Sequence, residues 1–315
     1  MLKLRVLLSG ATGFVGGKVL RSLDAFNVNV MGRSKPELVN SDNFFQSEIN
    51  SSTDYSNALN SVDIVIHSAA RVHVMNDKVS DPLAEFRSVN TAGTLNLARQ
   101  ASAAGVRRFI FVSSIKVSGE STLTDQPFQH SDQPKPEDAY GISKYEAEQG
   151  LRKIAAETGM EVVIIRPTLV YGPGVKANFL SLINLVRKRI PLPLGAIHNK
   201  RSLVAIDNLV DLIITCIDHP NAANETFLVS DDDDVSTTEL LKRIGVAFGI
   251  TPFLIPVPRW ALTLPASIIG KKAVVDRLYG SLQVDIAYTK ERLNWTPPVT
   301  MSQQLTKIAA SFNSK

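Results

Sequence analysis

The chain has 315 residues, of which 44% are hydrophobic, and a net charge of +4 with a pI of about 9.1. This length and apolar content suffice for one or two domains with a large core and exclude a disordered chain. The basic residues are scattered, without the dense basic stripe of nucleic-acid-binding proteins, so we expect no nucleic-acid partner. The one cysteine, Cys216, excludes an internal disulfide and favours a reducing compartment such as the cytoplasm.

The first half of the chain alternates between predicted strands and predicted helices. Apolar runs predict strands at residues 4–8, 28–31, 44–48, 64–67, 109–113 and 162–166. Amphipathic patterns predict helices at residues 17–23, 55–59, 83–104 and 140–157. Asp81 and Pro82 suit a helix start, and Gly105 and Gly159 suit positions after helix ends. This alternation predicts an α/β fold with a parallel sheet covered by helices on both faces.

Prolines and glycines interrupt the second half of the chain. Residues 119–138 are polar and proline-rich, which predicts a long surface loop. Further on we expect a helix at 178–188, a strand at 203–206, a helix from an Asp207 cap to Cys216, and a helix from the Ser236 capping box to residue 248. The acidic run 231–234 predicts a solvated turn, and we expect no metal site.

Two apolar segments bear on the location of the protein. The first strand begins almost at once, which leaves no room for a signal peptide, and no apolar run is long enough to span a membrane. Residues 260–269 are apolar but short and are interrupted by Pro265. We expect a core helix or a helix of a second domain there, although this segment could also rest on a membrane surface.

A glycine-rich turn joins the first predicted strand to the first predicted helix. Residues 9–16 read Ser-Gly-Ala-Thr-Gly-Phe-Val-Gly, and a dinucleotide-binding turn requires this strand–turn–helix context. Gly10 would permit a tight turn, Gly13 would let a pyrophosphate approach the backbone, and Gly16 would let the helix pack closely on the strand. A tight turn without a ligand is the alternative interpretation.

Three polar residues further along the chain form a candidate catalytic set. Tyr140 and Lys144 are one helical turn apart and therefore share a face, a spacing that suits a tyrosine acid–base whose pKa is lowered by an ammonium group. Ser114 follows the predicted strand 109–113, at the sheet edge where ligands bind. An ordinary exposed helix face also explains a lone Tyr-x-x-x-Lys pattern, but the order of the motifs along the chain favours catalysis.

These motifs together resemble the extended short-chain dehydrogenase/reductase family, in the branch of UDP-glucose 4-epimerase and related nucleotide-sugar enzymes. Gly10, Gly13 and Gly16 match the family's G-x-x-G-x-x-G turn, and Tyr140 to Lys144 match its Y-x-x-S-K motif. Residues 67–70, 89–94, 111–114 and 166–174 match further motifs. The resemblance implies a Rossmann-type doubly wound parallel sheet at residues 1–166. Residues 167–315 would mainly form a smaller mixed α/β substrate domain, from which the chain could cross back to the sheet.

The resemblance also assigns roles to residues. It makes Ser114, Tyr140 and Lys144 catalytic: the tyrosine shuttles a proton, and the lysine binds the nicotinamide ribose and lowers the tyrosine pKa. The implied cofactor-binding residues are Gly10, Thr12, Gly13, Phe14, Val15, Gly16, Arg33, Ser34, His67, Ala69, Ala70, Asn90, Ser113, Lys144 and Pro167. The implied or inferred substrate-binding residues are Lys116, Asn178, Arg201 and Arg277.

The cofactor and the reaction each have two interpretations. Arg33 and Ser34 stand where NAD-preferring members have an acidic residue, which favours NADP(H) unless Arg33 is simply solvated. The reaction most consistent with the motifs is 4-epimerisation of a UDP-hexose or UDP-N-acetylhexosamine. The alternative is an NADPH-dependent UDP-4-keto-6-deoxy-sugar 4-reductase for surface polysaccharide synthesis. A homodimer through the helices at 83–104 and 140–157 is also implied.

Overall fold

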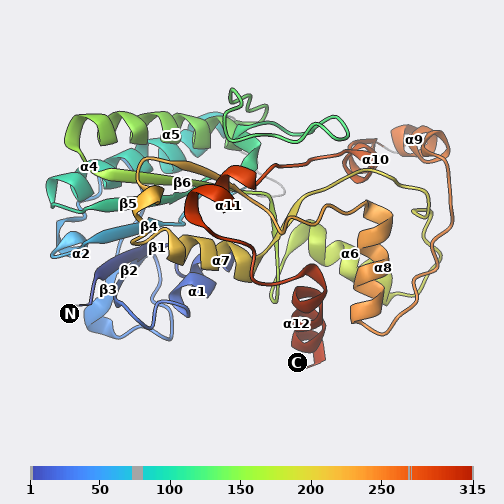
Figure 1. Ribbon diagram of the computed structural model, residues 1–315, viewed down its shortest axis with the longest axis horizontal. Coiled ribbons are helices and arrows are strands. Elements are labelled where there is room, and N and C mark those ends of the chain that lie inside the picture. The colour runs from blue at the N-terminus through green and yellow to red at the C-terminus, as the bar shows by residue number, and fades with distance from the viewer. Residues whose placement is uncertain (1–2, 73–80, 269, 271, 314–315) are drawn as a thin grey trace.

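Seven strands form one parallel sheet in the order β3-β2-β1-β4-β5-β6-β9 (Figure 1). The structure is a computed structural model and describes residues 3–72, 81–268, 270 and 272–313. The strands are β1 (Arg5–Ser9), β2 (Asn27–Gly32), β3 (Phe44–Gln46), β4 (Ile64–His67), β5 (Arg108–Val112), β6 (Glu161–Pro167) and β9 (Thr226–Val229). All six strands predicted from the first half are therefore confirmed. The strand order reverses between β1 and β4, where open α/β sheets bind their ligands.

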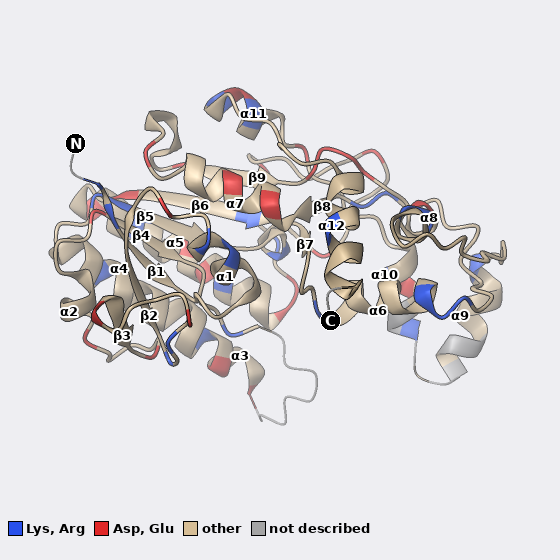
Figure 2. Ribbon diagram, turned by 90° about the horizontal axis from the view of Figure 1, so that it is seen from below, with Lys and Arg blue, Asp and Glu red and all other residues tan. Residues whose placement is uncertain are grey.

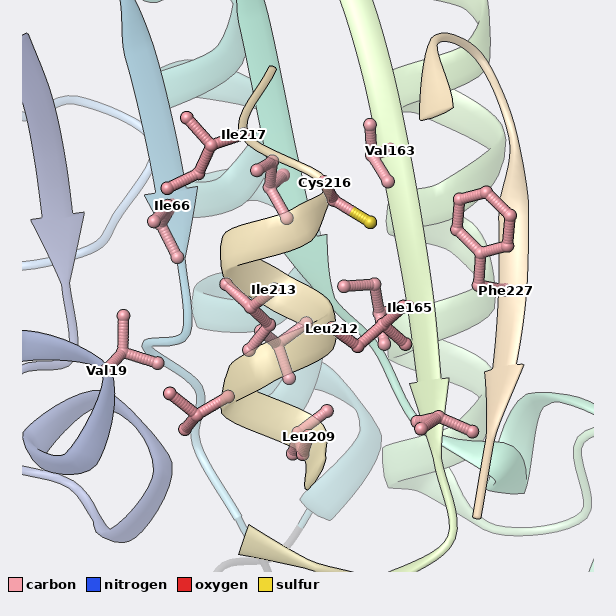
Figure 3. Packing of buried hydrophobic residues seen from close by; sticks show 14 of the residues in the cluster. Val19, Ile66, Val163, Ile165, Leu209, Leu212, Ile213, Cys216, Ile217 and Phe227 are labelled. Atoms are coloured by element: carbon pink, nitrogen blue, oxygen red, sulfur yellow. The ribbon is translucent and has the colours of Figure 1, made fainter. Parts of the chain in front are cut away.

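Helices cover both faces of the sheet. Buried residues of α2 (Ser56–Leu59), α4 (Thr94–Ala103) and α5 (Ala139–Thr158) pack against one face. Buried residues of α1 (Phe14–Leu20) and α7 (Ile206–Thr215) pack against the other, and α11 (Ala287–Leu293) adds to the same core. Figure 3 shows α7 on the sheet, with Cys216 and Ile217 just beyond its end pointing toward β4 and β6. Cys216 is thus a buried thiol, as predicted, and burial raises its pKa to about 12.

The helix predicted at residues 83–104 is divided into three parts. These are α3 (Pro82–Phe86), a π-helical segment (Arg87–Gly93) and α4. Asp81 caps α3 by accepting a hydrogen bond from the Ala84 N–H at 3.0 Å, as predicted. A Cβ on Gly93 would lie only 2.7 Å from the Ile49 side chain, so the helix passes close to the loop after β3 at this point. The widened π turn lies beside the sheet edge that carries the candidate site, where such segments often occur.

The remaining elements build a smaller unit at one end of the sheet (Figure 1). Its core contains residues of α6 (Ala177–Arg187), α8 (Thr237–Ala247) and α12 (Met301–Asn313), around the short strands β7 (Leu169–Tyr171) and β8 (Leu203–Ala205). The helices α9 (Arg259–Ile268) and α10 (Lys272–Tyr279) lie at its far end. β9 returns to the sheet and pairs with β6, and the domain division at residue 166 stays a prediction.

Two details of the second half of the chain correct the sequence-based expectations. Asp207 is not the cap of its helix, because β8 runs straight into α7 and Asp207 is already the second helical residue. Its carboxylate instead pairs with Lys18 and Lys307. Asp231 is not solvated: it is 9% exposed and accepts hydrogen bonds from the Tyr171 hydroxyl and the Ala205 N–H. The acidic run therefore ties β9 to β7 and β8.

Other expectations are confirmed within the described residues. Residues 119–138 form no helix or named strand, and isolated bridges join Thr122 to Ser281 and Phe128 to Val284. The Ser236 hydroxyl caps α8 by accepting from the Glu239 N–H. In the described part of the chain, no helix has the length and apolar character needed to cross a membrane. Residue 269, the end of the apolar segment 260–269, lies outside the described residues.

Candidate active site

The glycine turn has the geometry that a dinucleotide-binding turn needs. Gly10 adopts a φ of +79°, and a Cβ there would lie 2.6 Å from the Ala69 nitrogen. A Cβ on Gly16 would lie 2.2 Å from the Gly10 carbonyl oxygen, so only glycine allows α1 to pack this closely on the turn. Gly13 is the N-cap of α1 and contributes no capping side chain. The exposed part of the turn is Thr12 and Gly13, so a phosphate can approach the backbone there.

The residues around this turn complete its walls. Phe14 and Val15, the first residues of α1, are partly buried and pack against the core. Ala69 and Ala70 follow β4 and are partly exposed, beside the turn. Small side chains at these positions leave the carboxyl edge of the sheet open, so the described residues fit a dinucleotide along this edge.

The ring of His67 is directed into the protein rather than to the sheet edge, and the predicted cofactor contact of this residue stays a prediction. The ring is fully buried, and its Nδ1 and Nε2 atoms are hydrogen-bonded to the hydroxyls of Ser9 and Thr94 at 2.6 and 2.9 Å. Burial, with a further contribution from the Lys144 charge, lowers the pKa of His67 to about 3, so the ring is neutral. His67 therefore joins β1, β4 and α4 beneath the site.

Asn90 and Ser113 are also buried, and their side chains are used within the protein. The Asn90 amide accepts from the Arg71 N–H at 2.8 Å and donates to the Arg71 carbonyl and the Ser143 hydroxyl. The Ser113 hydroxyl donates to Glu148 Oε1 at 2.6 Å. Pro167 ends β6 and is buried too. The hydrogen bonds of Asn90 and Ser113 thus fix the backbone at the edge of the site, and their predicted cofactor contacts, like that of Pro167, stay predictions.

Ser114, Tyr140 and Lys144 meet at the carboxyl end of β5. Ser114 is partly exposed and begins the 3₁₀ turn Ile115–Val117. Tyr140 lies in the first turn of α5, which Asp138 caps. A Cβ on Gly141 would lie 2.7 Å from the Lys116 carbonyl oxygen, so this first turn presses against the segment after Ser114. The start of α5, which carries Tyr140 and Lys144, thus lies against the strand end that carries Ser114.

Lys144 is held beneath this site. Its Nζ donates to the Val112 carbonyl at 2.8 Å and lies 4.3 Å from the centre of the Phe111 ring. Burial lowers the pKa of Lys144 to about 7, although the Glu148 charge opposes this shift. The amine therefore changes its charge near neutral pH, whereas an exposed lysine stays charged.

The pKa of Tyr140 differs from the expectation. Burial, followed by the Asp138 charge, raises the Tyr140 pKa above its ordinary value. The expected lowering by Lys144 is not found, because the Lys144 amine is directed to the Val112 carbonyl and is itself readily neutralised. Ionisation of this phenol consequently requires additional positive charge near its oxygen.

The predicted substrate residues lie in different surroundings. Lys116 Nζ pairs with Glu120 at 2.8 Å and Asp138 at 2.5 Å. Burial opposes its charge, but the hydrogen bonds to these carboxylates outweigh burial and raise the Lys116 pKa. Its charge is thus already compensated by two carboxylates, which reduces its attraction for a phosphate. Asn178 is exposed near the start of α6.

Arg201 and Arg277 are brought together by the fold. Arg201 Nη1 donates to the carbonyls of Arg277 and Gly280 at 2.9 and 3.0 Å. Burial and the neighbouring Arg277 charge both lower the Arg201 pKa. With the Arg201 side chain partly buried next to Arg277, the two guanidinium groups form a candidate site for an anionic group such as a diphosphate.

Arg33 and Ser34 are exposed just beyond the carboxyl end of β2. The Arg33 backbone carbonyl accepts from the Gln46 side chain at 3.4 Å. This is the strand end at which Rossmann-type proteins recognise the adenosine ribose.

The sequence analysis missed a buried ion pair beneath the site. Glu148 is fully buried in α5 and accepts two hydrogen bonds from Arg166 in β6, at 2.9 and 2.6 Å. The signal was available, since Glu148 follows Lys144 by one helical turn on the face of α5 that meets the sheet. Among the described residues, no group of His, Cys, Asp and Glu is arranged to hold a metal ion.

Comparisons with known proteins agree with this geometry. The model of the NAD dependent epimerase/dehydratase family matches residues 6–230. The UDP-glucose 4-epimerase of Vibrio cholerae is 53% identical over 311 residues, which cover 98% of this chain and 95% of the relative.

Solved structures show the same fold. The UDP-N-acetylglucosamine 4-epimerase from Bacillus cereus superposes with a TM-score of 0.80 at 20% identity, covering 98% of this chain and 99% of that one. The Bordetella bronchiseptica enzyme WbmG in complex with NAD gives a TM-score of 0.78 at 19% identity, covering 99% and 94%. With its parallel sheet and glycine turn, and with Ser114, Tyr140 and Lys144 at one strand end, the chain belongs to the NAD dependent epimerase/dehydratase family, as an enzyme of the extended short-chain dehydrogenase/reductase type.

Proposed function

We propose that this protein is a UDP-sugar 4-epimerase that uses NAD. The observation that carries the proposal is the 53% identity to the Vibrio cholerae UDP-glucose 4-epimerase over almost the whole chain. It is supported by the joint position of Ser114, Tyr140 and Lys144 at the end of β5. The substrate would be a UDP-hexose or a UDP-N-acetylhexosamine.

The glycine turn would hold the cofactor pyrophosphate against the start of α1. Gly10 and Gly16 allow the tight turn, and the exposed backbone at Thr12 and Gly13 offers N–H groups to phosphate oxygens. A bound NAD would supply the chemistry of hydride transfer to and from carbon 4 of the sugar. Lys144 would hold the nicotinamide ribose, next to the tyrosine.

Tyr140 would remove the proton of the sugar 4-hydroxyl and later give a proton back to the oxygen, so that no proton is gained or lost over a cycle. Ser114 would hold that oxygen by a hydrogen bond. The pKa of Tyr140 is raised by burial, so the phenolate needs the positive charge of Lys144 to form. Arg201 and Arg277 would grip the UDP diphosphate while the keto sugar turns over to present its other face.

The competing reductase interpretation is not favoured, because the similar relative is an epimerase. Its support was Arg33, which lies exposed beyond the end of β2 and could pair with a 2′-phosphate. NADP(H) use, the identity of the sugar, a homodimer and a cytoplasmic location therefore stay predictions. Separate binding measurements with NAD and NADP would decide the role of Arg33.

The proposal predicts that Tyr140→Phe abolishes epimerisation of UDP-sugars while the fold is kept. Loss of a positioned acid–base group lowers the rate by about 10²- to 10⁴-fold. NMR of UDP-glucose and UDP-N-acetylglucosamine incubated with enzyme and NAD would follow the change at carbon 4. Tyr145→Phe, on the same helix, is the matched control and should retain activity. Full turnover by Tyr140→Phe would contradict the assigned role.

A further inference from the structure

α9 lies at the end of the molecule farthest from the sheet (Figures 1 and 2), and this helix and segments of the same unit carry exposed large apolar side chains. Trp260 and Leu264 of α9 are 68% and 63% exposed. Phe253 and Ile255, in the segment leading to α9, and Ile190, after α6, are exposed as well. We refer to these five residues as the α9 patch. Trp260 and Leu264 are one helical turn apart, and the segment after Ile190 pairs with the segment of Phe253 and Ile255, a grouping that is typical of an interaction site.

Neighbouring contacts hold the patch in place. Leu192 N–H donates to the Phe253 carbonyl, and Ile255 N–H donates to the Leu192 carbonyl, both at 2.8 Å. Leu254, between the two exposed residues, packs into the core of the smaller unit, as does Leu262 of α9. The inward side chains are therefore already used to anchor the segment, and the outward ones are left for a partner.

The charge around the patch has one sign. Residues 177–200 and 249–275 contain no Asp or Glu. Lys188 and Arg189 directly precede Ile190, Lys272 begins α10, and all three are exposed. The nearby Asp276 is paired with Arg259 at 3.0 Å. Exposed apolar side chains bordered by unopposed basic residues complement an anionic surface with an apolar interior.

We propose that the α9 patch docks this enzyme on the surface of an anionic phospholipid bilayer. Trp260 and Leu264 enter the interfacial layer, and Lys188, Arg189 and Lys272 contact lipid phosphates. Tryptophan favours this layer, because its ring is apolar while its indole N–H still finds a partner. α10 carries Lys272 at its start and Arg277 near its end, so docking brings the predicted diphosphate-binding arginines to the membrane surface. The proposal concerns binding and holds whether or not the proposed sugar chemistry is correct.

The chain carries its own reporter for this contact. It has only two tryptophans, Trp260, which is exposed, and Trp295, which is buried. Trp295 is 6% exposed, and its indole N–H donates to Asp211 at 2.7 Å. A change of tryptophan emission on mixing with vesicles therefore reports on Trp260.

The test is the fluorescence of the full chain with vesicles of phosphatidylglycerol and phosphatidylethanolamine in equal parts. We expect a blue shift of the emission, quenching by lipids brominated in the acyl chain, and loss of both at high salt. Phosphatidylcholine vesicles should give a much weaker shift. Absence of a shift with the anionic vesicles would overturn the proposal. A shift that grows with protein concentration without vesicles would also overturn it, because a second copy would then cover the patch.

Substitutions distinguish docking by the patch from general stickiness. Leu264→Ser keeps the reporter, and we expect vesicle partitioning about tenfold weaker, since one buried leucine contributes about that factor. Leu38→Ser is the matched control, because Leu38 is 67% exposed and lies outside the patch, and its partitioning should be unchanged. Equal partitioning of both variants would contradict the proposal. Without vesicles, UDP-sugar turnover by Leu264→Ser should equal that of the native chain. The vesicle assay contains no sugar, so its result can be interpreted even if the proposed enzymatic function is wrong.

Discussion

In the proposed mechanism, the charge of Lys144 governs how readily Tyr140 can act. Burial lowers the Lys144 pKa to about 7, so the amine is charged below that pH and progressively neutral above it. Burial also raises the Tyr140 pKa, and both shifts disfavour the phenolate. Contact with the anionic phenolate would restore the lysine charge, since each charge stabilises the other. The pair therefore acts as one unit, whose titration belongs to both groups.

Lys144→Met tests this dependence. Without the ammonium group, ionisation of Tyr140 costs more, so its pKa rises further and the pH profile of epimerisation should move to higher pH. We expect kcat near neutral pH to fall by about 10²-fold or more. The matched control is Lys153→Met in the same helix, where the lysine side chain is 77% exposed. An unchanged profile in Lys144→Met would show that the lysine does not support the tyrosine.

At the scale of elements, a buried ion pair holds α5 against β6. Glu148 accepts from Arg166 and from Ser113, the residue before the predicted catalytic serine. The pair thus links the helix that carries Tyr140 and Lys144 to the strand end that carries Ser114. Buried charges of this kind fix geometry, because each is costly when its partner is lost.

Glu148→Gln should therefore destabilise the protein markedly. The substitution leaves the Arg166 guanidinium buried without its counter-charge, which costs about 3–5 kcal/mol. Denaturant unfolding of the two proteins would measure this difference. Glu157→Gln, at a 58% exposed position of the same helix, should change stability by less than about 0.5 kcal/mol. A loss no larger in Glu148→Gln than in the control would refute the structural importance of the pair.

Elements buried on both faces could be predicted from the sequence, and elements defined by distant contacts could not. Residues 64–67 and 162–166 form continuous apolar runs, so both strands were found. β9 is four residues long, and only its pairing with β6 makes it a strand of the sheet. Helix 83–104 is divided by the π-helical segment Arg87–Gly93, which a pattern with a constant 3.6-residue period does not predict.

The candidate site shows the same division. The glycine turn and the Tyr140–Lys144 spacing follow local rules, so their positions could be predicted. The burial of His67 between two hydroxyls depends on packing between elements. So does the pairing of the positively charged Lys116 with Glu120 and Asp138. Residue type and spacing alone could not predict these internal contacts.

At the scale of the whole molecule, two units cooperate at one edge of the sheet. The sheet carries the glycine turn and the proposed catalytic set, while the smaller unit carries Arg201, Arg277 and the α9 patch. The loop at residues 119–138 joins them, through its bridges to Ser281 and Val284. A diphosphate-linked sugar held by the arginines could then reach the catalytic set from the smaller unit.

The central claim is 4-epimerisation without net oxidation. The most direct measurement is NMR of UDP-glucose carrying deuterium at carbon 4, incubated with the enzyme and a trace of NAD. The account predicts that the carbon 4 epimer accumulates with deuterium retained at that carbon and without accumulation of NADH. Loss of the deuterium from carbon 4, or NADH formed in proportion to an oxidised sugar, would contradict it.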